Sequence, residues 1–112
     1  MKRTIIISAM ILLAGCATVK LITPTQADVD RVLSKYPGYS LAELNEGKMN
    51  FEHRCTQCHK LKNPASRTEE QWNKIVPRMV QKANKKSEVI DAKTKDSILR
   101  YLVTMSAPPK AK

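Results

Sequence analysis

The feature that most constrains this chain is the pentapeptide at residues 55–59, which reads Cys-Thr-Gln-Cys-His. It places two thiols and an imidazole within one short stretch. Thiols at this spacing can each add to a vinyl group of the same porphyrin, and the adjoining histidine can bind the iron from one face. The pattern therefore predicts one covalently bound haem c, attached through Cys55 and Cys58 and ligated by His59.

Two other kinds of site also use a Cys-x-x-Cys pair. A thioredoxin-like dithiol would need a βαβ context, and strand signals are weak throughout this sequence. A zinc site could be built from Cys55, Cys58, His59 and His53, but no second ligand pair at zinc-finger spacing accompanies them. We therefore favour haem attachment over both.

The beginning of the chain looks like an export signal. A basic start precedes a short apolar stretch, residues 5–13, which is too short to span a bilayer as a helix. Residues 13–16, Leu-Ala-Gly-Cys, resemble the lipobox of bacterial lipoproteins, where the signal is cleaved before a cysteine that is then lipid-modified. We expect a signal peptide at residues 1–15 and lipidation at Cys16. An ordinary secretory signal and a retained membrane helix are the alternatives.

The expected domain organisation follows from this signal. Residues 16–27 are predicted to be a lipidated cysteine and tether, of which about eleven residues reach roughly 35 Å when extended. Residues 28–112 are predicted to form the haem domain, held in the periplasm of the bacterial cell envelope by lipid in the membrane. Because Ala17 rather than an aspartate follows the lipidated cysteine, resemblance to Gram-negative sorting rules favours the outer membrane.

The chain is strongly basic, with twenty Lys and Arg against ten Asp and Glu and a formal charge of +10. Removal of the signal peptide takes two basic residues away, so eighteen against ten remain and the mature charge is +8. Export argues against a nucleic-acid partner. The basic residues are spread along the chain, which fits a solvated surface, or steering toward acidic docking faces or an anionic membrane.

The first two expected helices lie before the pentapeptide. Residues 28–36 are predicted to form a short helix that stops at the Pro-Gly turn of residues 37–38. Ser40 and Glu43 have capping-box spacing, which predicts a second helix that runs into Cys55.

Two further helices are expected after the pentapeptide. Thr68 and Gln71 form a second capping box, and Pro77 is expected to kink or divide the helix that follows. Asp91 is the predicted cap of the last helix. The apolar residues of these two helices recur at helical spacing: Trp72, Ile75, Val76, Met79, Val80 and Ala83, then Ile98, Tyr101, Leu102 and Met105. The expected fold class is therefore all-α.

From Gly47 to Tyr101 the chain resembles a class I, monohaem cytochrome c. Gly47, Phe51 and Cys55 share one face of a helix. In this family the glycine allows close approach of the last helix, whose aromatic residue, here Tyr101, packs near the phenylalanine. The resemblance implies a cytochrome c-like bundle of three to five helices around one covalently bound haem.

The resemblance also implies a distal methionine as the sixth iron ligand. Met79 is the only methionine between the pentapeptide and the last helix, so we expect it to bind the iron together with His59. Plain core packing is its alternative role, and Met105 is the reserve ligand. Met49 and His53 are expected to be packing or surface residues.

A further aromatic residue has two expected roles. The indole N–H of Trp72 is expected either to reach a haem propionate or to anchor the core.

These expectations predict an electron-transfer protein and not an enzyme, since two protein ligands leave the iron no site for a substrate. The expected function is a one-electron carrier that meets redox proteins with acidic docking faces. A haem-based sensor and a non-catalytic electron-transfer subunit of a larger oxidoreductase are the alternatives.

Overall fold

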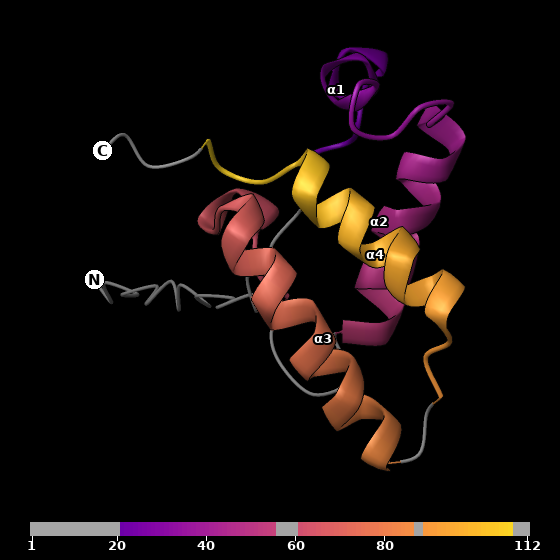
Figure 1. Ribbon diagram of the computed structural model, residues 1–112, viewed down its shortest axis with the longest axis vertical. Helices are drawn as coiled ribbons and strands as arrows, with labels where there is room; N and C mark the ends of the chain where they lie inside the picture. Colours follow the sequence, from indigo (N-terminus) through magenta and orange to yellow (C-terminus); the bar gives the residue numbers. More distant parts are fainter. Residues whose placement is uncertain (1–20, 56–60, 87–88, 109–112) are drawn as a thin grey trace, which may run out of the picture.

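The computed structural model describes residues 21–55, 61–86 and 89–108, and within these ranges the chain is helical (Figure 1). A lone bridge between Thr68 and Ala107 is the only β pairing among the described residues. The expected all-α class is therefore confirmed. The helical elements are α1 (Gln26–Val32), α2 (Leu41–Cys55), the 3-10 turn η1 (Pro64–Ser66), α3 (Glu69–Lys86) and α4 (Ala92–Thr104).

Local capping fixes the starts of the three long helices. The Oγ of Ser40 accepts a hydrogen bond from the amide of Glu43 at 3.1 Å at the start of α2. At α3 the bonding is reciprocal, since the amide of Gln71 donates to the Oγ1 of Thr68 at 3.3 Å and the Thr68 amide donates to the Gln71 side chain at 2.9 Å. Asp91 caps α4. All three predicted caps are confirmed, because each depends only on neighbouring residues.

Helix α1 lies earlier in the chain than the helix expected at residues 28–36. Its cap is Thr25, whose amide donates to the carboxylate of Asp28 at 2.8 Å. Gly38, between α1 and α2, has a φ of +78°, a value that residues with a Cβ rarely adopt. The predicted Pro-Gly turn therefore exists, but the helix ends before reaching it.

Of the two effects expected of Pro77, a kink or a division, the division is wrong, because α3 is a single helix from Glu69 to Lys86. Proline lacks the amide that would bond to the carbonyl of Asn73 one turn earlier. Both residues are exposed, so water can hydrate that carbonyl and the helix continues.

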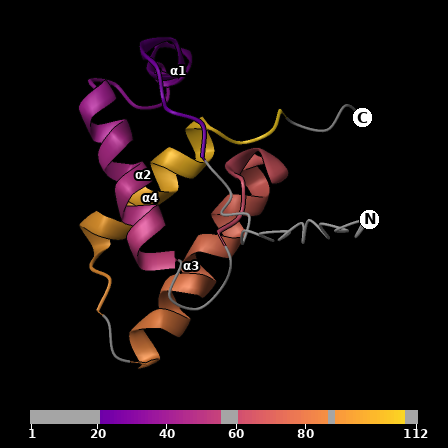
Figure 2. The same ribbon diagram turned by 180° about the vertical axis from the view of Figure 1, so that it is seen from behind.

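Helices α2 and α4 cross in the centre of the molecule and share its most extensive interhelical contact (Figures 1 and 2). Gly47 is buried at this crossing, where a Cβ atom would overlap the carbonyl oxygen of Ser97. The ring of Phe51 lies 5.8 Å from that of Tyr101 between centroids. The close helix approach that the family resemblance implied at Gly47 is thus confirmed.

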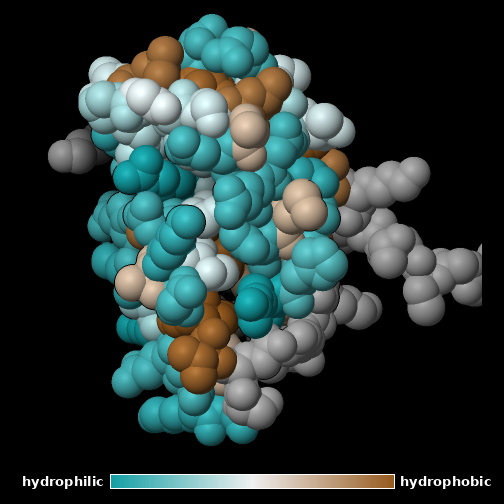
Figure 3. All heavy atoms as spheres, turned by 90° about the vertical axis from the view of Figure 1, so that its right-hand side faces the viewer, coloured by the Kyte–Doolittle hydropathy of each residue, from teal (hydrophilic) through white to brown (hydrophobic). Residues whose placement is uncertain are grey.

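Part of the predicted tether belongs to the folded domain. Leu21 packs against the core, Pro24 is buried and α1 begins at Gln26. Figure 3 shows a mostly hydrophilic surface on the α2 side, with apolar side chains gathered at the α1 end and where α3 passes to α4. No helix in the described ranges is long and apolar enough to cross a membrane.

Candidate functional site

A cavity of about 620 Å³ lies between the end of α2, α3 and α4. Its volume falls within the roughly 300–1,000 Å³ of ligand and cofactor sites in proteins. Its walls are predominantly apolar, as such sites require. The apolar lining consists of Phe51, Leu61, Trp72, Ile75, Val76, Met79, Val80, Ala83, Ile90, Ile98 and Leu102.

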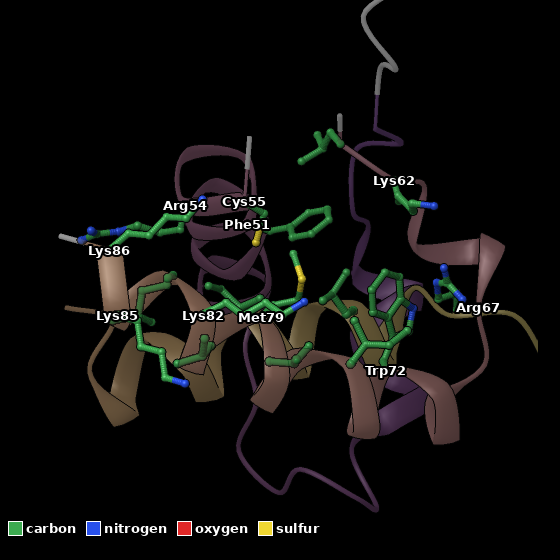
Figure 4. Close-up of a pocket in the computed structure, with 18 residues that line it drawn as sticks. Phe51, Arg54, Cys55, Lys62, Arg67, Trp72, Met79, Lys82, Lys85 and Lys86 are labelled. Atoms are coloured by element: carbon green, nitrogen blue, oxygen red, sulfur yellow. The ribbon is translucent and has the colours of Figure 1, made fainter. Parts of the chain in front are cut away.

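The cavity brings together two of the predicted site residues from different helices. Cys55, the last residue of α2, and Met79, in the middle of α3, both line it and are both half-buried. Figure 4 shows both sulfur atoms pointing into the space between the two helices. A thiol and a thioether therefore face one apolar cavity.

The remaining lining is cationic. None of the described lining residues is acidic, so the described lining suits a ligand with an apolar body and anionic groups. In Figure 4, Lys62 and Arg67 lie at the Trp72 end, while Arg54, Lys85 and Lys86 lie toward the opposite end. The basic lining residues are Arg54, Lys62, Arg67, Lys82, Lys85 and Lys86.

Trp72 acts as a core anchor, one of its two expected roles. It is only 4 % exposed, and its indole Nε1–H donates to the carbonyl oxygen of Pro64 at 2.9 Å. Its ring meets that of Phe51 edge-on at 6.4 Å. Because the only donor of the indole is used within the protein, the expectation that it reaches a propionate is not supported by this arrangement.

The two other methionines in the described ranges, Met49 and Met105, do not line the cavity. Met105 follows α4 and packs against the core without lining the cavity, which leaves Met79 as the better-placed ligand of the two. Met49 is 56 % exposed and His53 is exposed, so both are surface residues as expected.

Cys16, Cys58 and His59 lie outside the described residues, so their predicted roles stay predictions. Within the ranges that the structure describes, no group of three or more His, Cys, Asp or Glu side chains forms a metal site. A haem iron ligated by His59 and Met79 would not need such a group.

Burial controls the ionisation of Tyr101, which packs on the cavity residue Phe51. The pKa of Tyr101, which packs on Phe51 and is 1 % exposed, is raised because burial disfavours the phenolate. The ring is therefore a neutral, apolar support for the α2 side of the site at every physiological pH.

The gathering of the basic side chains around the cavity was not anticipated from the sequence. Lys82, Lys85 and Lys86 have i, i+3, i+4 spacing, which could have placed them on one helix face. Lys62 and Arg67 come from the η1 region, and only the tertiary fold brings them to the same cavity.

Comparisons with known proteins add no identification: no family model, no curated protein and no solved structure matches the chain.

Proposed function

We propose that this chain is a lipid-anchored one-electron carrier with one haem c, and not an enzyme. The observation that carries the proposal is the shared cavity of Cys55 and Met79, apolar in its walls and cationic among its remaining residues. Cys55 and Cys58 would hold the porphyrin covalently, and His59 and Met79 would bind its iron.

The residues of the cavity fit this cofactor on chemical grounds. Haem has a flat apolar body, which suits walls built from aliphatic and aromatic side chains, and two propionates, which suit a lining with cations and no described acid. The thioether of Met79 is a soft iron ligand of the kind used by c-type cytochromes. Cys55 stands at the end of α2, so the attachment residues that follow it in the sequence begin at the cavity wall.

The core geometry supports a cytochrome c-like bundle. Gly47 lets α2 and α4 approach closely, and Phe51 and Tyr101 pack in the crossing that results. Phe51 also lines the cavity, so the crossing supports one wall of the site directly. This is the relation between first and last helices that the family resemblance implied.

The bound iron would supply reversible one-electron exchange. The protein's part is to exclude water through its apolar walls and to bind the iron through Met79, which raises the reduction potential relative to two histidines. With His59 and Met79 both bound to it, the iron would have no open position for a substrate. The cations around the cavity would steer acidic docking faces of redox proteins toward the site.

The anchoring part of the proposal is carried by the sequence. Cleavage before Cys16 and its lipidation would place the domain in the periplasm, and Ala17 favours the outer membrane. Because the protein would be exported, we do not propose nucleic acid as a partner.

The decisive experiment compares exported, processed protein with its Met79→Ala and Met105→Leu variants. We expect the methionine–iron absorption band of the oxidised protein to disappear in Met79→Ala and to persist in Met105→Leu. The reduced Met79→Ala protein should bind carbon monoxide rapidly, whereas the unmodified protein should not.

Rapid, complete carbon monoxide binding by the unmodified protein would instead identify a sensor. A detergent extract in which the protein elutes only as part of a larger complex would indicate a subunit. Colourless protein whose Cys55 and Cys58 both react with an alkylating reagent would refute haem attachment altogether.

A further inference from the structure

The chain is folded against the core from Leu21 onward. Leu21 packs against the hydrophobic cluster, Pro24 is buried, and Thr25 caps α1 through its hydrogen bonds to Asp28. Val29, in the helix that this segment leads into, is completely buried. The segment before α1 is therefore a part of the domain and does not add to the reach of a tether.

This packing shortens the link to the proposed lipid. Only residues 17–20 separate Cys16 from Leu21, so the two Cα atoms can be at most about 18 Å apart, compared with roughly 35 Å for the tether expected from the sequence. A domain of about ninety residues has a radius of gyration of roughly 12 Å, and hence a diameter greater than this link. A domain on such a link cannot move clear of the bilayer.

Because the short link joins the lipidated cysteine to Leu21, the side of the domain on which Leu21 lies must face the lipid. In Figure 4 the ribbon that begins the described chain runs beside the stretch that carries Lys62, and Figures 1 and 2 place it near the same region before α3. Lys62 is exposed, lines the cavity and forms no ion pair with a described residue. A cation in this position attracts anionic headgroups.

We propose that the haem domain lies on an anionic bilayer surface, with the Lys62 end of the cavity toward the headgroups and residues 17–20 as its link. This inference rests on the proposed lipid anchor and haem. If the domain lies on the bilayer, electron transfer takes place at the membrane surface. The redox partners are then proteins of the same membrane.

The test measures the distance between haem and bilayer. Lipidated holoprotein is bound to vesicles with a headgroup fluorophore, which the haem quenches by energy transfer. Phosphatidylglycerol vesicles are compared with phosphatidylcholine vesicles. A flexible Gly-Ser insertion of roughly twenty residues before Leu21, with a mean span of about 25 Å, lengthens the link.

We expect strong quenching by the unmodified protein on both kinds of vesicle, and a clear loss of quenching after the insertion on phosphatidylcholine vesicles, where no net headgroup charge holds the lengthened protein at the surface. Lys62→Glu should reduce quenching on the anionic vesicles, and raised salt should have the same effect. The matched control is Lys93→Glu, an exposed residue near the start of α4, which should leave quenching unchanged.

Undiminished quenching after the insertion on phosphatidylcholine vesicles would overturn the short link. Equal effects of Lys62→Glu and Lys93→Glu would overturn the orientation. Flotation and the haem absorbance separate these outcomes from failure of the proposed function: protein that does not float with vesicles lacks the anchor, and protein without haem absorbance lacks the cofactor.

Discussion

Gly47 and Tyr101 are in direct contact where α2 and α4 cross, because a Cβ atom at position 47 would lie 2.8 Å from the Cβ of Tyr101. Real Cβ atoms do not approach one another so closely, and the neighbouring carbonyl of Ser97 is backbone that cannot move aside alone. The hydrogen atom of the glycine is what allows the two helices to pack at this separation. Since Phe51, one turn further along α2, lines the cavity, the helix crossing also determines the position of one wall of the site.

Gly47→Ala should therefore lower the free energy of unfolding. An alanine gains about 1 kcal/mol of helix propensity over glycine, but overpacking costs typically about 1–3 kcal/mol and two close contacts must be relieved here. Because one of these contacts is with backbone, we take the cost from the upper part of that range, about 2–3 kcal/mol, and expect a net loss of roughly 1–2 kcal/mol, measured by urea denaturation. Glu46→Ala, at an exposed position of the same helix, is the control and should change stability by less than about 0.5 kcal/mol. Equal stability of the two variants would contradict the tight crossing.

The elements that could be predicted from the sequence are those fixed by neighbouring residues. Ser40, Thr68 and Asp91 start their helices as expected because a cap needs only a side-chain oxygen and an amide two or three residues later. The all-α class followed from the helical spacing of the apolar residues. The continuity of α3 through Pro77 could not be predicted, since it depends on the exposure of that face in the folded domain.

Two residues of the candidate site were predicted from the sequence, Cys55 from a motif with its own chemistry and Met79 from the family resemblance. The structure brings both to one cavity, and their roles in binding haem stay predictions. The packing of Leu21 and the approach of Lys62 and Arg67 to the cavity depend on contacts between distant segments. No local pattern in the sequence encodes such contacts.

Trp72→Phe should destabilise the protein without changing the reduction potential of the proposed haem. The substitution removes one of the two donors to the buried carbonyl oxygen of Pro64, which keeps the 3.3 Å hydrogen bond from the Arg67 amide, so the lost bond costs about 0.5–1.5 kcal/mol. The potential should stay constant because the indole N–H is directed at the protein backbone. Urea denaturation and potentiometric titration measure the two effects.

Ile75→Val is the control for lost volume in the same cavity wall, since it removes one methylene and no hydrogen bond. Its expected cost is about 0.5–1.5 kcal/mol. A lower potential in Trp72→Phe with undiminished stability would show that the indole serves the cofactor instead.

Alkaline pH should destabilise the fold partly through Tyr39. Burial raises the pKa of Tyr39 from about 10 to about 12. The unfolded chain therefore loses the phenol proton first, so the contribution is complete below pH about 10 and is lost as pH rises toward about 12. Urea denaturation over this range should show a smaller decline for Tyr39→Phe than for the unmodified protein.

The same variant should cost little at neutral pH. The Tyr39 hydroxyl is buried and has no hydrogen-bond partner among the described residues, so its removal leaves no group unsatisfied. A large loss of stability at neutral pH, or a decline at alkaline pH as steep as that of the unmodified protein, would be inconsistent with this role.

Asn84→Ala should loosen the connection between α3 and α4. The Asn84 amide binds Ile90 at both backbone groups: its Oδ1 accepts from the Ile90 amide at 2.6 Å and its Nδ2 donates to the Ile90 carbonyl at 3.3 Å. Ile90 is 7 % exposed and lines the cavity, so this clamp holds one apolar wall in place. We expect a loss of about 1–2 kcal/mol in the free energy of unfolding and faster hydrogen exchange at the Ile90 amide.

Asn73→Ala provides the matched control, because Asn73 is an exposed residue of the same helix whose side chain makes no hydrogen bond with the described residues. Both variants gain the same helix propensity from alanine, so the difference between their unfolding free energies isolates the clamp. If the two variants were equally stable and the Ile90 amide exchanged at an unchanged rate, the wall at Ile90 would have to be held by packing alone.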